Sequence, residues 1–188
     1  MRWLLNLAKA VVALLIVLTL VAWLLPAQRH VERSVEVRAT PAQVWPWIAE
    51  PRRWSAWSPW LARDPKTRLD YEGPVSGAGA GWRWASLSQG NGHMRFTTAE
   101  PPQTLRYEMT FEDMGLQASG AFVLTPAADG TKVVWQMDAA LGRNPLTRWF
   151  GLALDNVVGA DFESGLGRLA AQVQAVAPAA SAASAVMP

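Results

Sequence analysis

Residues 54–60 read Trp-Ser-Ala-Trp-Ser-Pro-Trp, which places three indoles at positions i, i+3 and i+6. These positions are neighbours on a short helical turn, and Pro59 prevents an earlier helix from running through it. A cluster of large aromatic side chains needs a large apolar surface to pack against. We therefore expect the remainder of the chain to supply that surface.

The segment before this stretch predicts one strand and one short helix. Val31, Val35 and Val37 alternate with polar residues, as in a half-buried strand. Residues 40–43, Thr-Pro-Ala-Gln, form a capping box with proline at the first helical position. Pro46 removes an internal N–H, so we expect this helix to be short or kinked.

The segment after the tryptophan stretch changes to a period of two from about residue 67, which predicts strands. The alternating positions are Leu69/Tyr71, Trp82/Trp84, Met94/Phe96, Leu105/Tyr107/Met109/Phe111, Gly120/Phe122/Leu124 and Val133/Trp135/Met137. Turn residues separate these runs, so six strands follow one another in an antiparallel meander. The glycine-rich run 77–81 opens a strand rather than a helix, which favours a hairpin loop over a phosphate-binding loop.

The last third of the sequence predicts helices. Pro145 begins one helix, and we expect Gly159 to interrupt it and Asp161 to lie in the first turn of the next. From Phe162 to Val176 apolar residues recur at spacings of four and three, which is typical of a helix with one buried face. Residues 177–188 contain only Ala, Pro, Ser, Val and Met, and we expect a disordered tail there.

The N-terminal segment, residues 1–26, predicts a single transmembrane anchor. It has no charge from Ala10 to Leu25, and the apolar stretch is about the ~20 residues needed to cross a bilayer. A cleaved signal peptide is the alternative, although residues 24–28 form a poor cleavage site. We expect a linker at residues 27–30, a folded domain at 31–176, and placement of that domain outside the cytoplasm, on the periplasmic side.

Composition excludes several classes of function. The net charge is +2 and the basic residues are scattered, whereas nucleic-acid binding requires a basic stripe on a recognition module. The chain has no cysteine, which excludes a thiolate nucleophile, a disulfide scaffold and a cysteine metal site. The two histidines have no second ligand at metal-binding spacing. We expect no cofactor and no metal.

The order of strand, two short helices, six-strand meander and long helix resembles the START/Bet v 1-like (SRPBCC) superfamily. The chain is most similar to its bacterial polyketide cyclase/dehydrase-like branch, in which N-terminal membrane anchors also occur. The residues that carry the resemblance are 31–35, 39–41, 53–60, 90–94, 101–107, 130–135 and 159–166. The resemblance implies an α+β helix-grip fold: a seven-stranded antiparallel curved sheet, two short helices and a long C-terminal helix, preceded by one transmembrane helix. It also implies an apolar cavity beneath the long helix.

The inward-facing aromatic residues are the predicted lining of that cavity, because apolar ligand sites are rich in aromatic side chains. The predicted ligand-binding residues are Trp57, Trp60, Trp82, Trp84, Phe96, Tyr107, Met109, Phe111, Trp135 and Phe162. The predicted ligand is a hydrophobic or amphipathic small molecule, such as a lipid or polyketide-like compound, and a protein partner is unknown.

Two alternatives remain open from the sequence. The first is a cyclase or dehydratase that uses the same cavity, for which Tyr107 is a weak candidate acid or base. Arg83 and Glu108 fit cross-strand surface charges better than a catalytic pair. The second alternative is a protein-interaction domain, similar to co-chaperone-like members of the superfamily, with a filled interior and an exposed tryptophan groove at residues 54–60.

Overall fold

The computed structural model describes the backbone of residues 2–184 and the side chains as far as residue 176. Its elements are α1 (Arg2–Leu24), β1 (Gln28–Val37), α2 (Pro41–Ala49), η1 (Pro51–Ala56), α3 (Pro59–Arg63), β2 (Arg68–Glu72), β3 (Gly81–Ser86), β4 (Gly90–Glu100), β5 (Thr104–Phe111), η2 (Glu112–Met114), β6 (Leu116–Ala127), β7 (Gly130–Ala140), α4 (Pro145–Phe150) and α5 (Leu154–Ser184).

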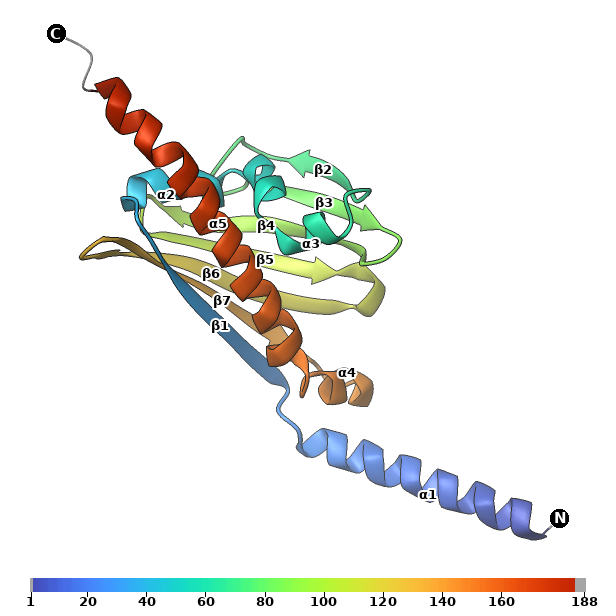
Figure 1. The fold of residues 1–188 in the computed structure, drawn as a ribbon. Helices are drawn as coiled ribbons and strands as arrows, with labels where there is room; N and C mark the ends of the chain where they lie inside the picture. The colour runs from blue at the N-terminus through green and yellow to red at the C-terminus, as the bar shows by residue number, and fades with distance from the viewer. Residues whose placement is uncertain (1, 185–188) are drawn as a thin grey trace.

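The seven strands form one antiparallel sheet in the order β1-β7-β6-β5-β4-β3-β2. Strands β2 to β7 pair with their neighbours in sequence. The first strand, β1, lies at the edge beside the last strand, β7, and Val31 lies opposite Met137. The sheet curves, and α5 lies across its concave face with α2 and α3 beside it (Figure 1). The predicted helix-grip architecture is confirmed.

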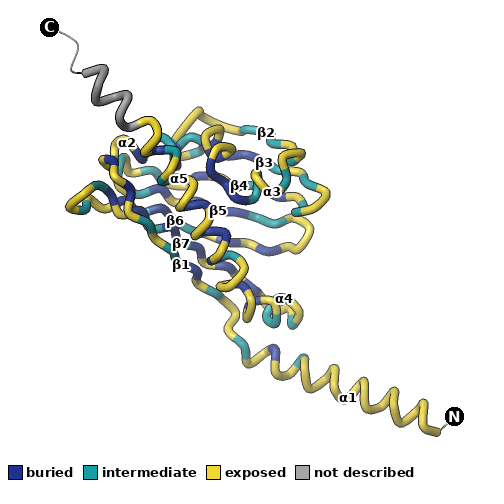
Figure 2. The backbone as a smooth tube through the Cα atoms, in the orientation of Figure 1, coloured by how far each residue is buried: buried dark blue, intermediate teal, exposed yellow. Residues whose placement is uncertain are grey.

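The apolar alternation predicts the inner face of the sheet correctly. Met94, Phe96, Phe122 and Trp135 are buried, whereas the residues that alternate with them are more exposed. Figure 2 shows buried backbone concentrated in the strands, while α1 is exposed along nearly its whole length. Strand β1 begins at Gln28, so most of the expected linker at 27–30 is strand.

The short helices follow their sequence signals. The backbone N–H of Thr40 donates to Gln43 Oε1 at 2.8 Å, which completes the capping box of α2. Pro46 lies inside α2, which ends after nine residues. The glycine-rich run forms the β2–β3 loop, but it is tied down: Gly77 N–H donates to Ala49 O at 3.0 Å and Gly79 N–H donates to Phe96 O at 2.7 Å.

The break between the C-terminal helices lies at residues 151–153, and the prediction of a break at Gly159 is wrong. Gly159 lies inside α5, where its missing side chain leaves room for the guanidinium of Arg33. Asp161 is therefore in the body of α5 rather than in a first turn, and Asp155 occupies the first turn instead. The predicted tail at 177–188 stays untested: its backbone is helical as far as Ser184, and residues 185–188 lie outside the described residues.

Candidate functional site

The space beneath the middle of α5 is filled by stacked aromatic rings. Phe162 of α5 lies on Trp135 of β7 with ring centroids 3.9 Å apart and planes 6° apart. Phe122 stacks on the indole of Trp135 at 4.9 Å. Trp54 and Trp57 contact the same indole edge-on, at 5.9 and 5.5 Å. The expectation of a hollow directly beneath the long helix is therefore wrong for this part of the domain.

Buried polar atoms within this aromatic core are paired. Trp54 Nε1 donates to Ile48 O at 2.9 Å, and Trp57 Nε1 donates to Trp47 O at 3.0 Å. Because an unpaired N–H in an apolar interior is costly, these bonds fix both indoles against the end of α2. The tryptophan-rich stretch therefore joins the first helices to the sheet.

Tyr107, the weak catalytic candidate, is a satisfied core residue. Its hydroxyl accepts a hydrogen bond from Trp135 Nε1 at 2.9 Å and donates to Gln136 O at 3.0 Å. Burial raises the pKa of Tyr107 well above its usual value, an effect that the Trp135 hydrogen bond only partly offsets. A phenol held this way is neutral and cannot act as a general base at ordinary pH.

An apolar cavity remains open at the other end of the sheet, between α3 and strands β3 to β5. Its volume is about 90 Å³. Its walls are Trp54, Ser58, Trp60, Leu61, Thr67, Trp82, Trp84, Gln89, Met94, Met109 and Phe111. The sheet contributes the floor and α3 the roof, and no described residue of α5 belongs to the lining.

The predicted binding residues divide between these two regions. Trp60, Trp82, Trp84, Met109 and Phe111 line the cavity. Trp57, Phe96, Tyr107, Trp135 and Phe162 are fully buried in the aromatic core, outside the lining. Sequence reasoning missed Trp54, Ser58, Leu61, Thr67, Gln89 and Met94. Met94 could have been found, because it alternates with Phe96 on an inward strand face.

The roof of the cavity is held by polar contacts at both of its edges. Trp60 Nε1 donates to Asp161 Oδ2 of α5 at 2.9 Å, and Arg63 forms an ion pair with the same carboxylate. From the opposite side, Gln89 Nε2 of the β3–β4 turn donates to Trp60 O at 2.8 Å. Helix α3 has only five residues, so these side-chain contacts, rather than helix propensity, fix its position.

The residue after α3 adds a further contact to the β3–β4 turn. Asp64 Oδ2 accepts hydrogen bonds from the hydroxyls of Ser86 at 2.6 Å and Ser88 at 2.8 Å. These bonds stabilise the ionised carboxylate and lower the pKa of Asp64. Helix α3 therefore covers the cavity and is held between α5 and the β3–β4 turn.

The cavity lining offers hydrogen bonding but no titratable group among the described residues. Its polar side chains are Ser58, Thr67 and Gln89. Thr67 Oγ1 is buried near the Asp64 carboxylate and contributes to the lowered pKa of Asp64. The other side chains of the lining present mainly apolar atoms to the cavity.

The ionisable residues singled out from the sequence lie on the surface. Arg83 pairs with Glu72 at 3.0 Å and with Glu112 at 3.3 Å, and not with Glu108. His93 also contacts Glu112, at 3.2 Å. Within the described part of the chain, no three His, Asp or Glu side chains come together as a metal site would require.

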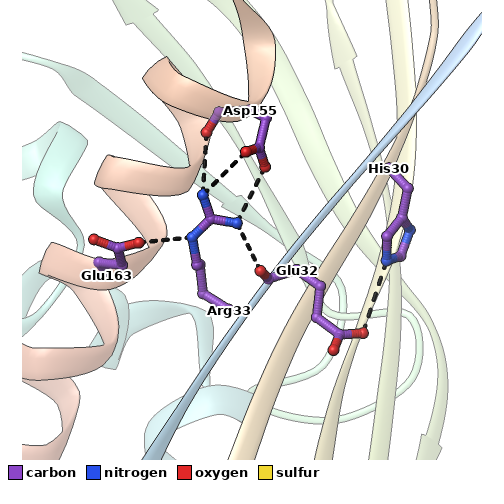
Figure 3. Close-up of polar contacts among 5 residues, drawn as sticks. All are labelled: His30, Glu32, Arg33, Asp155 and Glu163. Atoms are coloured by element: carbon purple, nitrogen blue, oxygen red, sulfur yellow. Dashed lines mark hydrogen bonds and ion pairs between the residues drawn. The ribbon is translucent and has the colours of Figure 1, made fainter.

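Arg33 connects β1 to the start of α5 (Figure 3). Its Nε donates to Glu163 Oε1 at 2.7 Å, and its Nη1 donates to Asp155 Oδ1 at 3.1 Å. The Arg33 guanidinium lowers the pKa of Asp155. Figure 3 also shows His30 beside Glu32, 3.7 Å away, on the solvent side of the same strand. A closer hydrogen bond to Asp138, at 2.8 Å, raises the pKa of His30.

A curved antiparallel sheet covered by a long C-terminal helix and two short helices defines a helix-grip domain, here with an aromatic-lined cavity beneath α3. The family model described as "Polyketide cyclase / dehydrase and lipid transport" matches residues 28–174. The chain belongs to this family. A comparison with curated proteins gave no significant match.

Solved structures share the fold at low sequence identity. A protein from Thermobifida fusca is 23% identical with a TM-score of 0.59, over 77% of this chain and 92% of that protein. Norcoclaurine synthase from Thalictrum flavum, a point mutant with a transition-state analogue, is 12% identical with a TM-score of 0.58, over 78% and 96%. DynU16, from the dynemicin biosynthetic locus, is 22% identical with a TM-score of 0.56, over 79% of this chain. The chain spans about half of DynU16, 48% of its length.

Proposed function

We propose that the protein binds the apolar part of a small hydrophobic or amphipathic molecule in the cavity beneath α3, close to a membrane in which α1 anchors it. The observation that carries this proposal is the contrast within one sheet: the interior is solid beneath α5 and open beneath α3. The family to which the chain belongs includes lipid transport in its description, which supports the same class of ligand.

The size of the cavity limits the ligand. Apolar cavities of roughly 150 Å³ accept a benzene ring, and drug-sized ligands occupy roughly 300–1,000 Å³. A volume of about 90 Å³ is smaller than such a benzene-binding cavity, so it fits the last few methylene groups of an acyl chain. Burial of roughly 100–150 Å² of ligand surface contributes about 3–4 kcal/mol before the loss of ligand freedom is counted, so binding is of millimolar order or weaker.

Tighter binding of a longer ligand requires α3 to move outward. The helix is held at its edges by Asp161 and Gln89, and its movement would extend the cavity while separating the ring of Trp60 from that of Trp135, which now lie 5.7 Å apart. We propose that α3 acts as the lid of the site, and that a lipid or polyketide-like ligand enters beneath it.

The membrane part of the proposal rests on α1. It has 23 residues and is long and apolar enough to cross a bilayer, a test that an N-terminal signal sequence also passes. We propose an uncleaved anchor with the domain on the periplasmic side. The intact mass of the protein purified from membranes tests this directly: retention of residues 1–26 supports the anchor, and their loss contradicts it.

The alternative functions have less support in the geometry. A cyclase or dehydratase needs an acid or base at the ligand, and no titratable side chain is found in the cavity lining over residues 2–176. The co-chaperone-like alternative requires an exposed tryptophan groove, but Trp54 and Trp57 are fully buried.

A series of primary alcohols tests the proposal. The full chain is held in nanodiscs and titrated calorimetrically with alcohols from butanol upward. Affinity should rise by about 0.8 kcal/mol for each added methylene until the cavity is full, and then level off. Met109→Phe reduces the cavity volume and should shorten the chain length at which the plateau begins, whereas Trp84→Ala should lengthen it.

The matched control is Phe111→Leu against Val176→Leu, because Phe111 lines the cavity and Val176 is exposed on α5. Both variants are measured in identical nanodiscs. The heat of alcohol partitioning into lipid is therefore the same for both and cancels from the difference between them. An identical plateau in every variant, with the fold intact by circular dichroism, would contradict ligand binding in this cavity.

A further inference from the structure

The short helix α4 rests against the C-terminal part of α1. Trp149 Nε1 donates to Leu18 O at 3.2 Å. Arg148 Nη1 donates to Trp23 O at 2.8 Å and to Leu25 O at 3.1 Å. The last carbonyls of a helix lack partners within the helix, and a cation near them interacts favourably with the helix dipole. Arg148 therefore caps α1 from the folded domain.

The sequence explains why α4 forms at this position. Asn144 Oδ1 accepts a hydrogen bond from Leu146 N–H at 2.9 Å, and Pro145 occupies the first helical position. The helix stops after six residues. Ala22 of α1 is fully buried in the contact between the two helices, although its neighbours along α1 are exposed.

The face of α4 that does not contact the protein is apolar. Leu146 is 76% exposed, Phe150 is 45% exposed and Leu152, which follows the helix, is 49% exposed. Large apolar side chains gathered on one exposed surface mark an interaction site. Figure 1 shows α4 beside the exit of α1, at the edge of the domain.

The contact with α1 determines how deep α4 would lie in a bilayer that α1 crosses. Six residues separate Leu18 from Leu24, the end of α1, which corresponds to about 9 Å of helix. A 23-residue helix is about 34 Å long, only slightly longer than the ~30 Å hydrocarbon layer. If α1 spans the layer, Leu18 lies inside it, and the indole of Trp149 that contacts Leu18 reaches the same depth. Interfacial helices bury their apolar faces by a comparable ~5–10 Å.

We propose that α4 is a membrane-seated helix: Leu146, Phe150 and Leu152 insert into the outer part of the same bilayer that α1 crosses. The occupant of this apolar face is lipid, because α4 is bonded to α1, whose own large apolar side chains are exposed along the helix. Arg143, directly before α4, is exposed, and in this arrangement it would lie near the headgroup layer. The helix therefore sets the orientation of the domain on the membrane.

This inference rests on the anchoring part of the proposed function, and one experiment separates the two. Because the chain has no cysteine, a single introduced cysteine carries a unique nitroxide label. Labels are placed with Leu146→Cys and Phe150→Cys on α4, Leu14→Cys in the middle of α1, and Leu87→Cys on the exposed β3–β4 turn. The full chain is reconstituted in nanodiscs of phosphatidylcholine and phosphatidylglycerol.

The readout is the collision rate of each label with oxygen, which concentrates in lipid, relative to a water-soluble nickel complex. The oxygen-to-nickel ratio at positions 146 and 150 should be several-fold above the ratio at 87 and should approach the ratio at 14. Ratios at 146 and 150 equal to that at 87, with a lipid ratio at 14, would overturn the inference and leave the anchor intact.

Two other outcomes also overturn the inference. If the oxygen-to-nickel ratio at position 14 is as low as that of a label in water, α1 does not span the bilayer. The depth assigned to α4, which is derived from α1, is then wrong as well. Spin–spin broadening at position 146 that disappears when labelled protein is diluted with unlabelled protein would show that a second copy of the chain, rather than lipid, covers α4.

Discussion

Two tryptophans of the same sheet, Trp135 and Trp84, show how differently its two ends are packed. Trp135 is surrounded by the rings of Trp54, Trp57, Trp60, Phe122 and Phe162, with centroids 3.9 to 5.9 Å away. Trp84 contacts Phe111 edge-on, with ring centroids 5.7 Å apart, and its side chain lines the cavity. Both side chains point inward by the same alternation. The difference comes from the covering helix: α5 is long and presents Phe162, whereas α3 has five residues.

The largest expected effect is the loss of stability when the core tryptophan is truncated. Trp135→Ala should lower the free energy of unfolding by about 3–5 kcal/mol, because it leaves a large void and removes a hydrogen bond to Tyr107. Trp84→Ala should cost about 1–2 kcal/mol, because its side chain already borders open space. Denaturant unfolding of the full chain in detergent measures both. Equal losses would contradict the contrast between the two regions.

A smaller effect is expected from Tyr107→Phe. Removing the hydroxyl leaves the buried Trp135 N–H without an acceptor, which should cost about 1–3 kcal/mol of unfolding free energy. The affinity for alcohols should not change, because Tyr107 does not line the cavity. Tyr71→Phe, at a half-buried ring on β2, is the matched control and should change stability by less than about 0.5 kcal/mol. A Tyr107→Phe protein that folds normally but loses ligand binding would revive a direct role for this residue.

The next smaller effect is expected on stability when the contact between Asp161 and α3 is weakened. Asp161→Asn removes the ion pair with Arg63 while keeping an oxygen for the Trp60 N–H, and it should cost about 1–2 kcal/mol. Hydrogen exchange of the α3 amides and ligand dissociation should both become faster. Asp155→Asn is the control, since this carboxylate contacts Arg33 rather than α3. Acceleration of α3 exchange by both variants alike would show that Asp161 does not hold the lid specifically.

The smallest expected effect is a pH dependence at the β1–α5 contact. Because Arg33 lowers the pKa of Asp155 in the folded protein, this contribution to stability is fully present above the ordinary pKa of 3.8. It is lost as the pH falls through the lower folded value, when the carboxylate becomes protonated. The unfolding midpoint of Asp155→Asn should therefore approach that of the unaltered protein at low pH. A constant difference across the acid range would contradict the ion pair.

The sequence predicts the architecture well because alternation and capping are local signals. Each of the seven strands follows from apolar residues at every second position, and Thr40 with Gln43 marks the start of α2. The position of the cavity could not be predicted. Alternation shows that Trp84 and Trp135 both face inward, but the stacking of Phe162 on Trp135 depends on how α5 lies across β7.

The helix break was misplaced for a similar reason. A glycine inside a helix costs about 1 kcal/mol, so Gly159 is a reasonable local signal for a break. In the structure the guanidinium of Arg33 occupies the space beside Gly159 and bonds to Asp155 and Glu163. These contacts join residues more than 120 positions apart in sequence, and they outweigh the local preference.

Fluorine NMR with 5-fluorotryptophan in the full chain tests the central claim most directly, with each resonance assigned by a Trp→Phe variant. Butanol is added to the protein in nanodiscs. The resonances of Trp60, Trp82 and Trp84 should shift with saturation, while those of Trp57 and Trp135 stay in place. Shifts confined to Trp57 and Trp135, or no shift at any indole at the highest butanol concentration that leaves the fold intact, would contradict a ligand site beneath α3.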